Sequence, residues 1–227
     1  MDFYLNELQQ WSDANHMQIN EHKTKEIIIS NSRNVSVVPL PGIERVENFK
    51  FLGVFVSEDL KWNDHISYIV GKANSRLHFL RQLKRAGVPT DDMLAYYIGE
   101  IRSVLEYAAP AWHSSLTDEL SDKLENIQKR ALRIVYGGSK FSDNSYDRFC
   151  NEISVAPLVV RRETLTSNFF QKILDRTNCL HHLIPARRDV AHVGRLRNYN
   201  PYHIPFARTE KFRNSFIMYC LRTILNN

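Results

Sequence analysis

The spacing of apolar residues changes near residue 60, and this change constrains the fold of the chain more than any other feature. From Phe49 to Val56, apolar side chains occupy both faces of a segment with the two-residue alternation of a strand, so we expect a strand covered on both sides. From Asn63 onward, apolar residues recur at the spacing of an amphipathic helix. The sequence therefore predicts an α+β fold that is mainly α, with a short N-terminal β-hairpin followed by a helical bundle.

Helix signals dominate the rest of the chain. Thr90 and Thr117 are predicted N-caps, Gly87 and Gly137 are predicted stops, and Pro110 predicts a break. The predicted helices span residues 3–16, 63–86, 90–101, 118–136, 158–176 and 215–225. Ile27, Ile28 and Ile29 form a β-branched run that predicts a further strand, whereas residues 181–213 are predicted to be mostly loop.

Composition excludes several protein classes. The chain has 227 residues and 43% hydrophobic residues, enough to fill a core, which argues against wholesale disorder. Three distant cysteines imply no disulfide framework and favour a reducing compartment. We expect neither a signal peptide nor a membrane helix, because the N-terminus is polar and no apolar run approaches about 20 residues. The net charge of +5 is compatible with a nucleic-acid partner.

Metal-binding patterns are weak. Cys179, His181, His182 and His192 invite a zinc interpretation, but the spacing lacks a second nearby cysteine pair, so no metal site is predicted. Asp91–Asp92 is the chain's adjacent aspartate pair, and its place after Thr90 favours the first turn of a helix over metal binding. No P-loop, dinucleotide-binding or Ser-His-Asp pattern is present.

Six short patterns occur in the order used by one family. They are Trp11 with Ile19–Asn20 and Lys23–Thr24; Phe51–Val54 (FLGV); Leu60, Trp62 and His65–Ile66; Leu105–Tyr107 with Trp112; Leu124–Ile134; and Phe212–Phe216 (FRNSF). Together they resemble the C-terminal part of reverse transcriptases of non-LTR (LINE-like, jockey-type) retrotransposons. The resemblance implies the end of the palm with a primer-grip-like hairpin at residues 1–60, a helical thumb at 61–138 and a helical, basic C-terminal extension at 139–227.

The resemblance implies a parent RNA-directed DNA polymerase that uses Mg²⁺. The family's aromatic-x-Asp-Asp turn is absent, so we expect no catalytic residue and no cofactor in this chain. The expectation is a fragment that is inactive alone and retains at most nucleic-acid binding, with an RNA/DNA template–primer as the partner and a nuclear or cytoplasmic location. The alternative is a helical protein-interaction module used by a host. The sequence does not indicate an oligomeric state.

Three groups of residues are candidates for a site. Lys23 matches a palm-motif lysine, and the alternative is a solvated lysine beside a strand. Phe51, Leu52 and Gly53 match the primer grip, and the alternative is a buried strand with a glycine bulge. The candidates for nucleic-acid binding are basic residues, for which the alternative is a solvated surface or a flexible packing segment: Lys72, Arg76, Arg81, Lys84, Arg85, Arg195 and Arg197.

Overall fold

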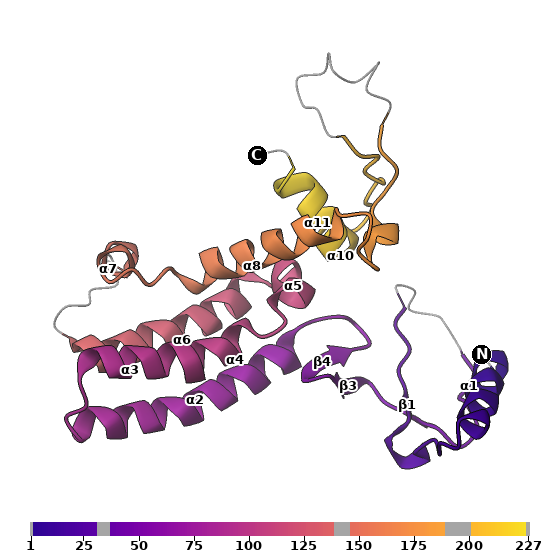
Figure 1. Cartoon of the computed structure of the whole chain (residues 1–227), viewed down its shortest axis with the longest axis horizontal. Coiled ribbons are helices and arrows are strands. Elements are labelled where there is room, and N and C mark those ends of the chain that lie inside the picture. The colour runs from indigo at the N-terminus through magenta and orange to yellow at the C-terminus, as the bar shows by residue number, and fades with distance from the viewer. Residues whose placement is uncertain (1, 31–36, 139–145, 189–200, 226–227) are drawn as a thin grey trace. The chain divides into compact units, whose positions relative to one another are not determined.

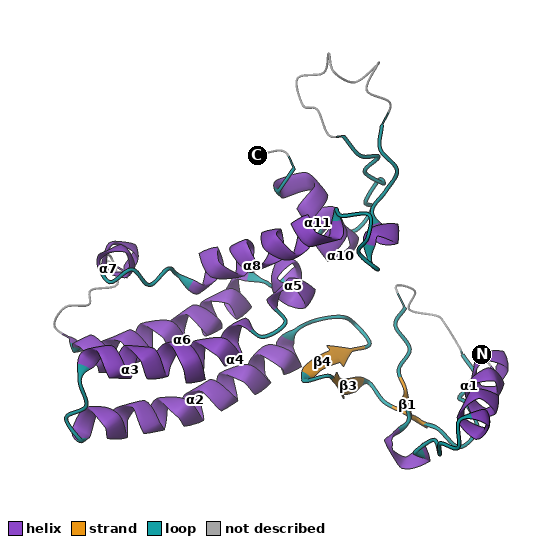
Figure 2. Ribbon diagram, in the orientation of Figure 1, coloured by secondary structure: helices purple, strands orange, loops and turns teal. Residues whose placement is uncertain are grey.

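The computed structural model describes residues 2–30, 37–138, 146–188 and 201–225 (Figure 1). Helices dominate these ranges, and their strands form two small two-stranded sheets (Figure 2). The predicted class, α+β and mainly α, is confirmed. Among the described residues, no helix is both long and apolar enough to cross a membrane.

The chain divides into two compact units, Met1–His65 and Ile66–Asn227. In its described residues, the first unit contains α1 (Asp2–Ala14), a 3-10 turn η1 (Glu21–Lys23) and four short strands. Strand β1 (Lys25–Glu26) pairs in parallel with β2 (Glu44–Arg45), and β3 (Asn48–Phe51) pairs antiparallel with β4 (Val54–Ser57). The strand predicted at Ile27–Ile29 is wrong, because the chain leaves the sheet after Glu26.

The segment Phe49–Val56 is a hairpin and not the single covered strand that its alternation predicted. The chain reverses at Leu52 and Gly53, whose φ angles of 47° and 87° place both residues in the left-handed region of a two-residue hairpin turn. In the register of β3 and β4, Phe49 lies opposite Val56 and Phe51 opposite Val54. The expectation that both faces of this segment are covered is also wrong, since Phe51 and Leu52 are 61% and 76% exposed.

The second unit is helical. Its first helix, α2, begins at Asn63, three residues before the unit boundary at Ile66. The helical elements are, in chain order, α2 (Asn63–Arg85), α3 (Thr90–Tyr96), a π-helical turn η2 (Tyr97–Arg102), α4 (Ser103–Glu106), α5 (Ala109–Trp112), η3 (His113–Ser115), α6 (Asp118–Tyr136), α7 (Tyr146–Glu152), α8 (Leu158–Ile173), η6 (His181–Leu183), α10 (Glu210–Arg213) and α11 (Phe216–Thr223). In Figure 1, α2, the run from α3 to α4, and α6 lie lengthwise beside one another.

The ends of these helices follow local sequence signals. Thr117 caps α6 by accepting a hydrogen bond from the Leu120 amide at 3.4 Å, as predicted. The break predicted at Pro110 occurs just before it, where Ala108 adopts a φ of 54° between α4 and α5. The capping role predicted for Thr90 is wrong, because Thr90 is the first residue of α3 and Pro89 occupies the cap position.

The core of the second unit is built on buried stripes of these helices. Helix α2 buries Ile66, Ile69, Ala73, Leu77 and Leu80, each at most 2% exposed. The α3–α4 run and α6 contribute Tyr97, Leu105 and Leu124 among others. Two smaller clusters form around Phe149 and around Phe170, so the bundle extends through α7, α8 and α11.

Candidate nucleic-acid interface

After Asp64 in its first turn, helix α2 carries charge of one sign. Between Ile66 and Arg85 it carries Lys72, Arg76, Arg81, Lys84 and Arg85 and no carboxylate. The buried stripe fixes the orientation of the helix about its axis, so each of these side chains has a defined direction. The five cations are therefore part of a rigid surface and not of a loop.

The fold uses two of these cations internally. The Arg76 guanidinium donates to the Glu100 carbonyl and lies 3.5 Å from the Glu100 carboxylate. The Lys84 ammonium donates to the Val135 carbonyl at 3.0 Å, where α6 ends and its last carbonyls lack helical partners. Both residues tie α2 to its neighbours, and their predicted role in nucleic-acid binding stays a prediction.

The other three cations of α2 lie on two sides of the buried stripe, with Lys72 and Arg85 exposed and Arg81 half-buried. With about 100° between successive residues, Lys72 lies on one flank of the stripe, and Arg81 and Arg85 lie on the other. Lys72 is exposed, with its ammonium 5.3 Å from the centroid of the Tyr68 ring. Within the described part of the chain, Arg81 and Arg85 have neither a hydrogen bond nor an ion pair.

Helix α6 adds a cation that the sequence analysis did not single out as a binding candidate. The exposed Arg130 donates to the Asn74 side-chain oxygen at 2.8 Å, which holds its guanidinium against α2. Asn74 lies two turns before Arg81 on the same side of α2. We call Arg81, Arg85 and Arg130 the basic flank. A tertiary contact between residues 56 positions apart creates it, so no local signal in the sequence could have found it.

The primer-grip candidates form the tip of the β3–β4 hairpin in the first unit. Phe51 and Leu52 are exposed, and Gly53 supplies the second left-handed position of the turn. Lys50 places its ammonium 5.8 Å from the centroid of the Phe55 ring, behind the tip. The tip is therefore apolar with one nearby cation, and a contact with a primer stays a prediction.

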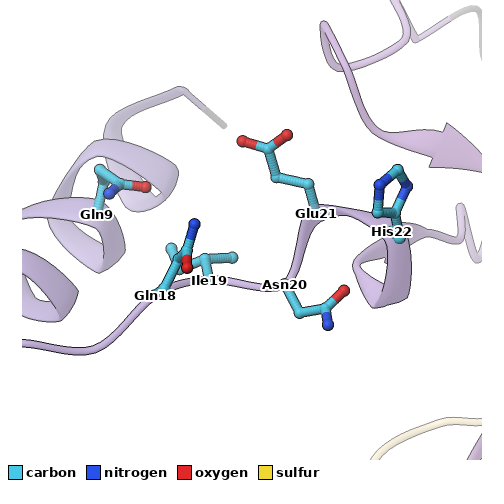
Figure 3. A pocket seen from close by; sticks show the side chains of 6 residues that line it. All are labelled: Gln9, Gln18, Ile19, Asn20, Glu21 and His22. Atoms are coloured by element: carbon cyan, nitrogen blue, oxygen red, sulfur yellow. The ribbon is translucent and has the colours of Figure 1, made fainter.

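Lys23 lies beside a polar cavity of the first unit. The cavity measures about 430 Å³, and Gln9, Gln18, Ile19, Asn20, Glu21 and His22 line it (Figure 3). Asn20 uses its side-chain oxygen to accept the Lys23 amide at 3.0 Å, and Gln9 donates to Asp13 at 3.0 Å. Since Lys23 is exposed and is not among the lining residues, the geometry assigns it no chemical step.

The structure does not bring the remaining candidate residues together in one site. Arg195, Arg197 and His192 lie outside the described residues. The His181 ring bonds the Ile173 carbonyl at 3.0 Å, and the His182 ring bonds the Cys179 carbonyl at 2.7 Å. Among the described residues, no three His, Cys, Asp or Glu side chains are grouped closely enough to hold a metal ion.

Buried polar groups next to the bundle core are structural. The Tyr97 hydroxyl donates to Gln128, and Gln128 donates to the Tyr146 hydroxyl at 2.8 Å and the Ala156 carbonyl at 3.1 Å. Glu125 accepts from the Leu158 and Val159 amides at 3.0 and 3.2 Å, and so caps α8. These contacts lock α6 against α8 and keep α6, and with it Arg130, in a fixed position.

Two histidines are held neutral by their surroundings. Burial lowers the pKa of His65 to about 4, and burial together with the nearby Arg162 guanidinium lowers the pKa of His113 to about 4. The Phe55 amide lies 3.5 Å from the His65 ring nitrogen, which must be unprotonated to accept it. Neither histidine adds positive charge to a nucleic-acid surface at neutral pH.

A comparison with known protein families gives a local match. The family model of the N-terminal region of alkylated DNA repair protein alkB homolog 8 matches residues 62–103, a minor part of the 227-residue chain. This segment contains α2, α3 and η2, and therefore most of the cations considered above. No curated protein and no solved structure matches the chain.

This match overturns the family suggested by the short motifs. The segment that carried the start of the supposed thumb, from Trp62 through His65–Ile66, matches a different family and not a reverse transcriptase. The identification as a non-LTR retrotransposon reverse transcriptase, with its palm and thumb, is wrong. The physical reason is that four- and five-residue patterns such as FLGV and RALRI also satisfy general requirements of hairpins and amphipathic helices. Residues 62–103 of this chain are similar to the N-terminal region of an alkylated DNA repair protein, alkB homolog 8.

Proposed function

We propose that the helical unit binds nucleic acid through the basic flank of Arg81, Arg85 and Arg130. The observation that carries the proposal is the segment from Ile66 to Arg85, which has five cations and no carboxylate and directs Arg81 and Arg85 away from the core. Arginine is suited to this task, because its planar guanidinium donates to phosphate oxygens in a bidentate geometry.

Rigidity of the flank supports the proposal. Arg81 and Arg85 are one helical turn apart, about 6 Å along the axis, and α2 cannot rotate without exposing Leu77 and Leu80. The contact from Arg130 to Asn74 fixes the third guanidinium beside the same helix. Arg130, held by Asn74, loses little side-chain freedom on binding, so more of its electrostatic attraction is retained as affinity.

The local family match supports the same partner. The family model that matches residues 62–103 describes a protein named for the repair of alkylated DNA. The matched residues include Arg81 and Arg85 but not Arg130. We take from the match only the class of partner, a nucleic acid, and no repair activity.

A salt titration of binding tests the proposal. Fluorescence anisotropy of a labelled duplex should show affinity that falls with salt, with a slope that decreases by about 0.9 for each phosphate contact removed. Arg85→Glu should weaken binding and reduce the slope. Lys123→Glu is the matched control, because Lys123 is an exposed cation of α6 that already pairs with Glu119 at 2.7 Å, and it should change binding little. Equal effects of the two reversals, or binding that salt does not weaken, would contradict the proposal.

A protein-interaction module is the second candidate, favoured by exposed apolar side chains on α8. Val159 and Val160 are adjacent and exposed at the start of this helix, and Phe169 is exposed two to three turns later. Such a surface binds by apolar burial, which added salt does not weaken. The same salt titration therefore distinguishes the two candidates.

A further inference from the structure

Phe79 is exposed on helix α2, whose orientation is fixed by its buried stripe. Its side chain is 59% exposed, between the buried residues Leu77 and Leu80. The His78 ring lies nearly perpendicular to the Phe79 ring, at an interplanar angle of 79° and with ring centroids 5.9 Å apart, and more than half of the Phe79 side chain stays exposed. A large aromatic side chain is thus held at a fixed point of the surface.

The surroundings of Phe79 are basic. Lys72 lies two turns earlier on nearly the same line of the helix, about 10 Å away along the axis. Tyr68 lies one turn before Lys72, and the Lys72 ammonium rests over its ring. We call Tyr68, Lys72 and Phe79 the aromatic ridge. The basic flank lies on another side of the same helix. No carboxylate occurs in the sequence between Ile66 and Arg85, and the Glu100 carboxylate that faces α2 lies 3.5 Å from the Arg76 guanidinium.

An exposed phenylalanine is by itself ordinary on a protein surface. Trp11 is a useful comparison: it is 55% exposed on α1, a helix that carries Asp2, Glu7 and Asp13 and no lysine or arginine. The two exposed rings differ in the charge around them, and only the ring on α2 has surroundings that attract a polyanion. Charge complementarity therefore selects nucleic acid as the partner of the Phe79 ring.

We propose that Phe79 is a stacking platform for an unpaired base, so that the site on α2 favours single-stranded over double-stranded nucleic acid. This inference rests on the function proposed above. A single strand exposes the faces of its bases, and one base can lie on the phenyl ring while an adjacent phosphate meets Lys72. In a duplex both faces of each internal base are covered by neighbouring base pairs, so the ring has nothing to stack on.

Substitutions at Phe79, measured with two kinds of oligonucleotide, test the inference. Phe79→Ala should weaken binding of a single-stranded oligonucleotide about tenfold, in line with the usual contribution of one stacked base. Binding of a duplex of the same length should change little, and so should the salt slope, since no charge is removed. Phe79→Trp should keep the single-strand affinity, whereas Phe79→Leu, which is apolar but has no aromatic face, should lose it. Single-stranded RNA and DNA are measured in parallel.

Trp11→Ala is the matched control, because it removes an exposed ring of similar exposure from an acidic helix, and it should leave both affinities unchanged. Far-ultraviolet circular dichroism of each variant checks that the helices persist. Equal losses for single strand and duplex, or no loss with Phe79→Ala while Arg85→Glu still weakens binding, would overturn the stacking role alone. Failure of the unmodified chain to bind either oligonucleotide would overturn the proposed function and the stacking role together.

Discussion

The units Met1–His65 and Ile66–Asn227 differ in what they bury. Among the described residues of the first unit, the buried side chains are the polar Ser12, Glu26 and His65. The second unit buries large apolar side chains, including Trp112 and Phe170. The first unit has polar contacts in place of a core: Ser12 donates to the Met17 carbonyl at 2.8 Å, and Arg45 donates to Glu26 at 2.7 Å.

The apolar core makes the second unit the better place for a rigid site. Burial of apolar surface is the dominant favourable contribution to folding, whereas one hydrogen bond contributes only about 1 kcal/mol net. The second unit can therefore hold the cations of α2 at fixed spacing. Local opening of the first unit should cost less free energy than opening of the second. The exposed tip at Phe51–Leu52 can therefore adjust its shape to a partner, but it is not a preformed site.

The largest expected effect is a loss of stability on replacing one of the chain's three tryptophans. Trp112 is fully buried and donates its indole N–H to the Tyr107 carbonyl at 3.0 Å, so Trp112→Ala should lower the free energy of unfolding by about 3–5 kcal/mol. Trp11→Ala should change it by less than about 0.5 kcal/mol, because that side chain is exposed. Trp62 is half-buried, so Trp62→Ala should fall between them. Urea denaturation followed by circular dichroism gives the three values, and similar losses for Trp11 and Trp112 would break the comparison between the units.

The second prediction concerns the buried polar network of the second unit. Gln128 is fully buried, and Gln128→Ala would leave the Tyr97 hydroxyl and the Ala156 carbonyl without this partner, at a cost of about 2–4 kcal/mol. Gln82→Ala on the exposed side of α2 is the control and should cost less than about 0.5 kcal/mol. Hydrogen exchange should show faster exchange throughout α6 and α8 in the Gln128 variant. Loss of protection confined to the first unit would contradict the assignment of this network to the bundle.

Much of the bundle could be predicted from sequence because its signals are local. The buried stripe from Ile66 to Leu80, the Thr117 cap and the break near Pro110 each depend on residues within a few turns of one another, and the structure confirms them. The apolar alternation of residues 49–56 predicted one strand there and not a turn at Leu52–Gly53. Leucine rarely adopts a positive φ, so Leu52–Gly53 carries no turn signal as strong as Asn-Gly, and the alternation continued through it.

The candidate site was less predictable, because it depends on contacts between distant segments. Sequence analysis found the cations of α2 but not that Glu100 and Val135 engage Arg76 and Lys84. Arg130 joins the flank only through Asn74, and Phe79 was not recognised because exposure of one ring is a property of the packed bundle. The mistaken family followed from the same limit, since short motifs report local structure and not common origin.

The third prediction is a fall in stability on acidification. The pKa of His113 is about 4 in the folded chain, below the ordinary value of 6.5, so the unfolded chain binds a proton first as pH falls. The stability contributed by the neutral ring is full above about pH 6.5 and is lost progressively towards pH 4. We expect a loss of about 1–2 kcal/mol after allowing for partial exposure and solvent screening. His113→Gln should flatten this part of the pH profile in urea denaturation.

The pKa of His65 in the first unit is lowered to about 4 by burial as well, so the comparison of the units predicts two separate readouts. Protonation of His65 would oppose its contact with the Phe55 amide and should speed hydrogen exchange in the β3–β4 hairpin over the same pH window. His65→Gln should remove that change and leave the pH dependence of bundle unfolding in place. If His65→Gln removed both, the two units would unfold as one.

The smallest expected effect is a gain in the stability of the hairpin. Leu52 has a φ of 47° and is largely exposed, so its side chain contributes little burial and its backbone conformation is unfavourable for leucine. Leu52→Asn creates an Asn-Gly turn, which favours left-handed angles at both positions, and should raise the free energy of local opening by about 1 kcal/mol. Hydrogen exchange of the β3 and β4 amides measures this quantity. Phe51→Asn is the control, because Phe51 lies in the strand opposite Val54, where asparagine brings no conformational gain. Added protection in the bundle helices as well as in the hairpin would show that the local stability of the first unit is coupled to the core of the second, and that the two units are not independent.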